Sequence, residues 1–333
     1  MKVDVQAVEE ELARIQRELT HEVRTSLFNL VVMSPDAQQQ MVDDTLNYLL
    51  GKRAARVIHV ANRNVAQSRI DVSARCFVDR ERKGVCFQEI IITNGRDGAG
   101  GAPGTWIPLL VRDIPTHVLW LDTLSGKEAL FSHVRNQADK IIVDADHCVE
   151  LGDDPEAVLA ALRRASVEEA VPLADFSWRR LRPYRRLTAL AFDGERAERL
   201  DEITRVEVTG LAPMSARYLG LWLAERLGWT QDGPFRFRDI QGRLVQMKTT
   251  AAAPDCDASI RFLLGAVHRG GRAVEVRASE DGCADLEYPG GAEEQVVTVP
   301  SSGEILLEEV DAVYADSLFR DALAASSLKP AEQ

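Results

Sequence analysis

The sequence has few basic residues for its length, few cysteines and no long apolar run. Lys and Arg together number 40 against 52 Asp and Glu, so the 333 residues carry a formal net charge of −12. A protein that binds a phosphate backbone needs a basic surface that releases counterions. The acidic net charge therefore excludes nucleic acid as the expected partner. No apolar stretch reaches the ~20 residues of a membrane span, so we expect no membrane-spanning helix.

The five cysteines are odd in number, widely spaced and without a CxxC pair. This pattern does not fit a secreted domain held together by disulfides. The first twenty residues, MKVDVQAVEEELARIQRELT, are charged and amphipathic, whereas a signal peptide is basic and then apolar. We therefore expect a cytoplasmic protein.

Common motifs of enzyme and metal sites are also missing. The sequence contains no GxxxxGK[ST], GxSxG, HExxH or EF-hand loop, and none of its six histidines has metal-ligand spacing to a cysteine or another histidine. We therefore predict no catalytic residue, no metal site and no cofactor. Enzymes without these motifs exist, so an enzyme of another kind stays open.

Hydrophobic periodicity predicts an α/β chain with two domains. The N-terminal α/β domain is expected over residues 1–195, with a mainly parallel sheet. Two apolar runs, Val118–Leu121 and Lys140–Val143, are separated by a helical segment, an order that is typical of parallel strands. Their continuous apolar character requires cover on both faces of the sheet, so they are expected to be buried neighbours.

A smaller α+β domain is expected over residues 203–325, after the polar stretch GERAERLDE. Its strand-like segments between 205 and 288 predict a mostly antiparallel sheet. Helical spacing of apolar residues predicts helices at about 213–227 and 303–324. The tail 326–333 is expected to be frayed.

Two polar segments are candidate ligand sites. The Gly-rich stretch 94–104 follows a strand, but Thr105 to Pro108 do not continue it as the helix that a phosphate cradle needs, so a mobile surface loop is favoured. Asp144, Asp146 and His147 follow another strand, with no further ligand identifiable. Capping and solvation of the strand end is favoured over a metal site.

Cys76 and Cys86 flank a predicted hairpin turn. A turn about residues 80–82 would place them opposite each other, with Cβ atoms within about 5 Å. A reversible disulfide is therefore a possible redox feature, although cytosolic cysteine pairs usually stay reduced.

The strongest local signal is the segment DFSWRRLRPYRR at residues 175–186, called the arginine segment below. It places five arginines within eight residues of an otherwise acidic protein, interleaved with aromatic rings. Arg, Trp and Tyr dominate interface hot spots because they bury large areas and form charge-assisted hydrogen bonds. The alternative is a basic helix start paired with acids of its own chain. The candidate partner-binding residues are Trp178, Arg179, Arg180, Arg182, Tyr184, Arg185 and Arg186. Trp178 is expected to anchor the segment, whereas Arg182 and Arg185 are expected to project outward.

The order of segments resembles the glucose-6-phosphate dehydrogenase assembly protein family (OpcA). The stretches that carry the resemblance are GKRAARVIHV (51–60), WIPLLVRDIPTHVLWLD (106–122), ADKIIVDADH (138–147) and DFSWRRLRPYRRLTALAFD (175–193). Where the family has Pro-Trp-Arg, this chain has Pro183-Tyr184-Arg185. The C-terminal part agrees in length and pattern only.

The resemblance implies a non-catalytic protein that binds glucose-6-phosphate dehydrogenase, aids its oligomerisation and raises its activity. It would thereby promote NADPH supply through the oxidative pentose phosphate pathway. Two other classes stay open at this point. One is a phosphosugar-binding enzyme that uses the arginines at 179–186. The other is a metabolite sensor that uses the same arginines or the strand ends near Asp113, Asp122 and Asp144.

Overall fold

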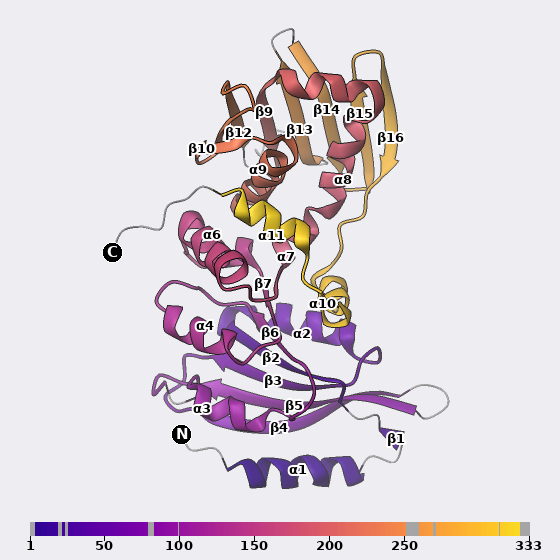
Figure 1. Ribbon diagram of the computed structural model, residues 1–333. Coiled ribbons are helices and arrows are strands. Elements are labelled where there is room, and N and C mark those ends of the chain that lie inside the picture. Colours follow the sequence, from indigo (N-terminus) through magenta and orange to yellow (C-terminus); the bar gives the residue numbers. More distant parts are fainter. Residues whose placement is uncertain are drawn as a thin grey trace. The chain divides into compact units, whose positions relative to one another are not determined.

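The chain folds into two compact units (Figure 1). The computed structural model describes residues 4–18, 22–23, 26–78, 83–98, 100–250, 260–268, 271–312 and 314–326. The first unit contains residues 1–153, 171–176 and 301–315, and the second contains 154–170, 177–300 and 316–333. The contiguous division at 195–203 expected from the sequence differs from this, because the chain passes between the units several times. Most of the tail expected to fray lies outside the described residues.

The sheet of the first unit is parallel except for one strand, which confirms the predicted α/β class. The strand order is β1-β5-β3-β2-β6-β7-β8, and β4 pairs antiparallel with β5. The predicted neighbours pair in parallel register, from His117 opposite Lys140 to Trp120 opposite Val143. The strands are β1 (Glu22–Val23), β2 (Phe28–Pro35), β3 (Ala55–Asn62), β4 (Arg69–Val78), β5 (Lys83–Asn94), β6 (Thr116–Trp120), β7 (Lys140–Val143) and β8 (Leu173–Asp175).

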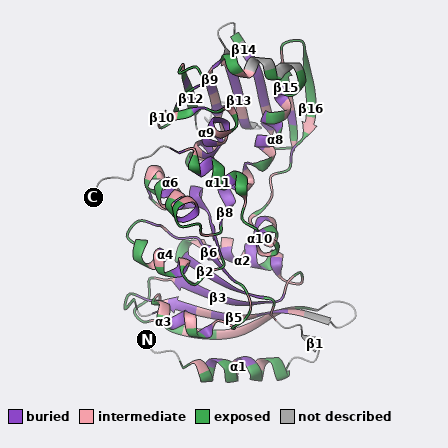
Figure 2. Cartoon of the chain, viewed as in Figure 1, coloured by how far each residue is buried: buried purple, intermediate pink, exposed green. Residues whose placement is uncertain are grey.

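Figure 2 shows the central strands of this sheet as buried. Helix α2 carries Val42, Leu46 and Leu49 at helical spacing, and these residues join the core formed with β2 and β3. Full burial of one such side chain contributes about 1.5–3 kcal/mol. The helices and 3₁₀ segments of this unit are α1 (Val5–Glu18), η1 (Asp36–Gln38), α2 (Gln39–Leu49), α3 (Pro103–Trp106), η2 (Ile107–Leu109), α4 (Glu128–Arg135), α5 (Ala145–Glu150) and α10 (Ser302–Asp311).

Helix α10 comes from the far end of the chain and packs against α2. Ile305 and Leu306 belong to the same core as Leu46. Gly303 permits this close approach, because a Cβ at that position would lie 2.3 Å from Cβ of Tyr48. The buried ammonium of Lys140 donates to the carbonyl oxygens of Glu309 and Ala312, each at 2.8 Å, and forms an ion pair with the Glu309 carboxylate. These contacts assign residues 302–311 to the first unit.

The second unit has an eight-stranded sheet in the order β10-β11-β12-β9-β13-β14-β15-β16. The pairs are antiparallel except β12 with β9, so the predicted mostly antiparallel sheet is confirmed. The strands are β9 (Ile203–Thr209), β10 (Thr230–Gly233), β11 (Arg236–Arg238), β12 (Leu244–Thr250), β13 (Ile260–His268), β14 (Gly271–Ser279), β15 (Cys283–Tyr288) and β16 (Gly291–Val296).

The helices of the second unit include α9 (Pro213–Leu227), which confirms the helix predicted at about 213–227. The single helix expected at 303–324 is wrong. Two helices occupy that range, α10 in the first unit and α11 (Ser317–Ala324) in the second, and Asp316 caps the latter through Leu318 N and Phe319 N. The other helical elements are α6 (Pro155–Arg163), η3 (Arg164–Glu168), α7 (Phe176–Arg180), α8 (Arg182–Ala191) and η4 (Gly194–Glu202).

Candidate functional site

The arginine segment leaves β8 and forms α7 and the start of α8. Pro183 stands at the start of α8, where its missing N–H costs nothing and its fixed φ suits a helix. Helix α8 has one buried face and one exposed face. Tyr184, Arg185 and Leu187 are buried, whereas Arg182 and Arg186 are exposed. The cluster of arginines is therefore divided between the interior and the surface of the second unit.

Trp178 is the centre of the buried half. Its indole is 1% exposed and contacts Phe319 and Tyr218, with ring centroids 5.2 and 6.2 Å away. Its Nε1 donates to Oδ2 of Asp316 at 2.9 Å. Trp178 thus anchors the segment to α9 and α11, as expected from the sequence.

Arg185 is part of this interior, and the expectation that it projects outward is wrong. Its guanidinium lies 3.4 Å from the centroid of the Trp178 ring, a cation–π arrangement, and it is 7% exposed. Burial lowers the pKa of Arg185 to about 10, with Asp316 acting in the opposite direction. The helix period explains the error, because Arg185 follows Leu181 by four residues and shares its buried face.

Two further candidates also serve the fold. Tyr184 stacks on Phe262 of β13 with ring centroids 4.4 Å apart, so the ring covers one face of the sheet. Arg179 pairs with Asp316 at 3.5 Å, and its side chain is 17% exposed. Arg180 is half-buried. Arg179 therefore fits the alternative expected from the sequence, in which an arginine pairs with an acid of its own chain.

Arg182 and Arg186 line a surface groove of about 340 Å³. One wall consists of Pro183, Leu187 and Leu190 of α8, and the other of residues 295–298 at the end of β16. Strand β16 is an edge of its sheet, and Val296 is 87% exposed. An open sheet edge presents unpaired backbone N–H and C=O groups. The groove therefore combines an apolar wall on α8, a mixed polar and apolar wall at the end of β16, two cationic side chains and an available strand edge.

Cys76 and Cys86 lie directly opposite each other in the β4–β5 pair and are joined by a disulfide, with Cα atoms 4.1 Å apart. The turn expected at 80–82 lies outside the described residues. Cys148 is a buried free thiol whose pKa is raised, first by burial and then by neighbouring carboxylates that include Asp175. A regulatory role for the disulfide stays a prediction.

One acid near a strand end is tied to nearby backbone, because Asp122, which follows β6, accepts from the amide of Thr123 at 2.8 Å. Asp153, which follows α5, accepts from the amides of Leu124 and Ser125, at 2.6 and 3.2 Å. Asp122 and Asp144 are buried, whereas Asp113 is exposed in a turn with φ of 66°. In the described ranges, no group of three or more His, Cys, Asp or Glu side chains is placed to hold a metal ion.

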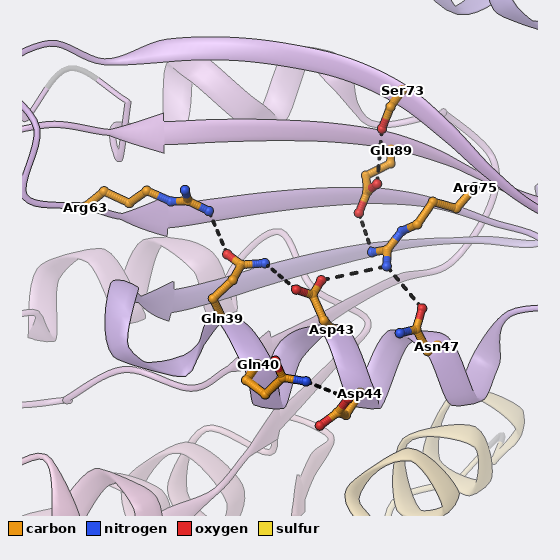
Figure 3. Close-up of polar contacts among 9 residues, drawn as sticks. All are labelled: Gln39, Gln40, Asp43, Asp44, Asn47, Arg63, Ser73, Arg75 and Glu89. Carbon is orange, nitrogen blue, oxygen red and sulfur yellow. Dashed lines mark hydrogen bonds and ion pairs between the residues drawn. The ribbon is translucent and has the colours of Figure 1, made fainter.

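A polar row on α2 was missed by the sequence analysis (Figure 3). Gln39, Asp43 and Asn47 follow one another at intervals of four and face Arg63 and Arg75. Arg75 also forms an ion pair with Glu89, a buried residue of β5. The spacing was visible in the sequence, but only the tertiary structure shows that Arg63, after β3, and Arg75, on β4, are the cations that meet it. These contacts hold α2 in place over its sheet.

The chain also matches known proteins over most of its length. Residues 47–164 match the model of the glucose-6-phosphate dehydrogenase subunit N-terminal domain, and residues 171–323 match that of the C-terminal domain. No helix in the part of the chain that the structure describes has both the length and the apolar character to cross a membrane.

Three curated proteins, all provisionally named OxPP cycle protein OpcA, are similar in sequence. Identity is 26% with the Synechocystis protein, over 76% of this chain and 58% of that protein. It is 26% with the Synechococcus elongatus protein and 28% with the Nostoc punctiforme protein, covering 76% and 77% of this chain and 62% and 60% of theirs. The chain thus spans about three fifths of the length of these relatives.

Similar solved structures include a 3-ketoreductase from Actinomadura kijaniata, with a TM-score of 0.49, 12% identity and coverage of 89% of this chain and 94% of that one. A dehydrogenase from Clostridium difficile has a TM-score of 0.46, 7% identity and coverage of 89% and 95%. Both likenesses are too distant to inform the site. On the two matching domain models and the three relatives, the chain belongs to the OpcA family of glucose-6-phosphate dehydrogenase assembly proteins.

Proposed function

We propose that this chain is a non-catalytic partner of glucose-6-phosphate dehydrogenase that aids its oligomerisation and raises its activity. Through this action it promotes NADPH supply in the oxidative pentose phosphate pathway. The observation that carries the proposal is the ordered match of both domain models, each described as part of a dehydrogenase subunit.

The proposed contact surface is the groove beside α8. Exposed Arg182 and Arg186 supply positive charge in a chain whose net charge is −12, so they suit an acidic patch or an acidic extended segment of the dehydrogenase. The apolar side chains of Leu187 and Leu190 give the same surface an apolar floor. Trp178, Tyr184 and Arg185 contribute by holding α8 in position rather than by touching the partner.

The test is to co-express the chain with the dehydrogenase of the same organism and to measure complex size and enzyme kinetics. The combined variant Arg182→Ala, Arg186→Ala should weaken association at least tenfold, which is about 1.4 kcal/mol. Its melting temperature should move by about 2 °C or less, because substitutions at exposed positions usually change stability by under ~0.5 kcal/mol.

The matched control is Arg236→Ala with Arg238→Ala, which removes the same charge from exposed positions on β11 of the same unit. This control should bind within about twofold of the unchanged chain, since long-range charge effects are screened by salt. Equal loss in both variants would mean that net charge acts without a docking site. If the unchanged chain alters neither the kinetics nor the size of the dehydrogenase, the functional proposal fails.

The same purified chain should not oxidise glucose 6-phosphate on its own. Turnover of a phosphosugar by the free chain, lost in the Arg182→Ala, Arg186→Ala variant, would favour the enzyme alternative. The kinetic assay without dehydrogenase therefore separates the two functional classes.

A further inference from the structure

A cavity of about 450 Å³ lies at the carboxyl ends of four parallel strands in the first unit. It is bordered by Met33 of β2, Val60 of β3, Asn94 of β5 and Trp120 of β6. Strand β2 lies between β3 and β6, so the strands that follow β2 in the sequence are added first on one side of it and later on the other. Open α/β sheets bind ligands at this kind of position, outside the strand ends where the strand order changes direction.

The walls of the cavity are mainly apolar. Met33, Val60 and Trp120 line it from the sheet, and Ala129 and Leu130 line it from α4. Trp120 is held in place by donation from its Nε1 to the Asp122 carbonyl at 2.8 Å and by edge contact with Phe131. A cavity of this size with a few fixed polar groups is typical of small-molecule sites.

A chain of hydrogen bonds crosses one side of the cavity. The Lys127 ammonium lies 2.5 Å from the Asp122 carboxylate, and Asn62 donates to the same oxygen of Asp122 at 2.7 Å. Asn94 in turn donates to the amide oxygen of Asn62 at 2.7 Å. Each residue therefore fixes the orientation of the next, across β3, β5 and the segment after β6.

The Gly-rich loop contacts Asn94, the last residue of this chain of hydrogen bonds. The amide of Gly100 donates to the side-chain oxygen of Asn94 at 3.0 Å, so the Asn94 nitrogen must point the other way. A Cβ on Gly101 would lie 2.8 Å from that nitrogen, which explains why glycine stands there. The loop runs into the single turn of α3, and its Gly98 and Gly101 line the cavity while residues 96–98 are exposed. The mobile surface loop favoured from the sequence stays a prediction.

The polar groups of this row have donor hydrogens to spare. An ammonium has three N–H donors and an amide has two, whereas the chain above uses one donor from each of Lys127, Asn62 and Asn94. The exposed imidazole of His133 lines the same cavity. A complementary ligand must therefore bring acceptor oxygens to the polar side and an apolar ring to the opposite wall.

We propose that this cavity binds a small nucleotide, with the ring against Ala129 and Leu130 of α4 and the acceptor oxygens at Lys127, Asn62 and Asn94. Inorganic phosphate lacks the ring, and a sugar phosphate lacks the apolar face that the larger wall requires. The inference concerns the free chain and is independent of dehydrogenase binding.

The test uses isothermal titration of the full chain, without dehydrogenase, against AMP, ATP, NADP⁺, glucose 6-phosphate and inorganic phosphate. At least one of the three nucleotides should bind with a Kd below 1 mM, and neither glucose 6-phosphate nor inorganic phosphate should match it. Ala129→Trp should abolish binding because the exposed Ala129 lies at the wall of the cavity. Lys127→Gln should weaken binding at least tenfold.

The matched control is Ala160→Trp, which enlarges an exposed alanine on α6 of the other unit and should bind as the unchanged chain does. Hydrogen exchange on peptides from α4 and the Gly-rich loop should slow with nucleotide in the unchanged chain and in Ala160→Trp. The proposal is overturned if none of the nucleotides binds, if Ala129→Trp binds normally while folded, or if glucose 6-phosphate binds more tightly than every nucleotide.

Discussion

His59 should make the first unit less stable as pH falls, and the size of the effect follows from its burial. The side chain is 1% exposed on β3, and its Nε2 lies 2.8 Å from the Ser34 hydroxyl. Burial is the main cause that lowers the pKa of His59 to about 4, assisted by the Arg63 cation and opposed by Asp43. The folded chain therefore holds this imidazole neutral at a pH where the unfolded chain has already protonated it.

The sign follows from proton linkage. Between pH 6.5 and pH 4 the unfolded state binds more protons at His59 than the folded state does, so stability decreases as pH falls through this window. The contribution is negligible at pH 8, reaches about 2 kcal/mol of lost stability at pH 5, and levels off near 3 kcal/mol below pH 4. Carboxylates titrate in the same range, so the contribution of one histidine must be obtained by difference.

The assay is native-state hydrogen exchange in urea on peptides from β2 and β3, which reports the unfolding free energy of the first unit from pH 8 to pH 5. His59→Gln keeps a neutral hydrogen-bonding group near Ser34 and should lose about 2 kcal/mol less than the unchanged chain over this range. His133→Gln, at an exposed position on α4, is the matched control. Parallel curves for His59→Gln and the unchanged chain would refute the assignment of a buried neutral imidazole.

Three further variants test the packing described above. Arg185→Ala should lower the melting temperature clearly, because the void left by the side chain and the lost contact with the Trp178 ring cost about 2–4 kcal/mol of unfolding free energy. Arg186→Ala, at an exposed position, should change stability by less than ~0.5 kcal/mol in the same thermal scan. Gly303→Ala should cost about 1–3 kcal/mol in urea unfolding because its methyl group meets α2, and Gly104→Ala, with open space around it, should be nearly neutral. Lys140→Ala should cost about 3–5 kcal/mol because it removes the buried cation of the ion pair with Glu309, and an unfolding free energy within 1 kcal/mol of the unchanged chain would contradict that reading.

Local patterns determined which elements form. The apolar run of Lys140–Val143 specified a strand buried on both faces, and the segment at about 213–227 was predicted as a helix where α9 (Pro213–Leu227) lies. Such signals work because a strand and a helix place side chains with periods of two and 3.6 residues, which the order of residues records directly. The opposition of Cys76 and Cys86 was predictable for the same reason, since a hairpin pairs residues by their distance from the turn.

Only the tertiary structure decided which elements meet. Nothing near residues 302–311 indicates that this helix packs on α2 in the first unit, because its apolar face would suit either sheet. The sequence likewise could not divide the arginine segment, since the burial of Arg185 depends on the distant rings of Tyr218 and Phe319 that hold Trp178 beneath it. The cavity at the strand ends was hidden for the same physical reason: residues far apart in the chain become neighbours only when parallel strands align their carboxyl ends.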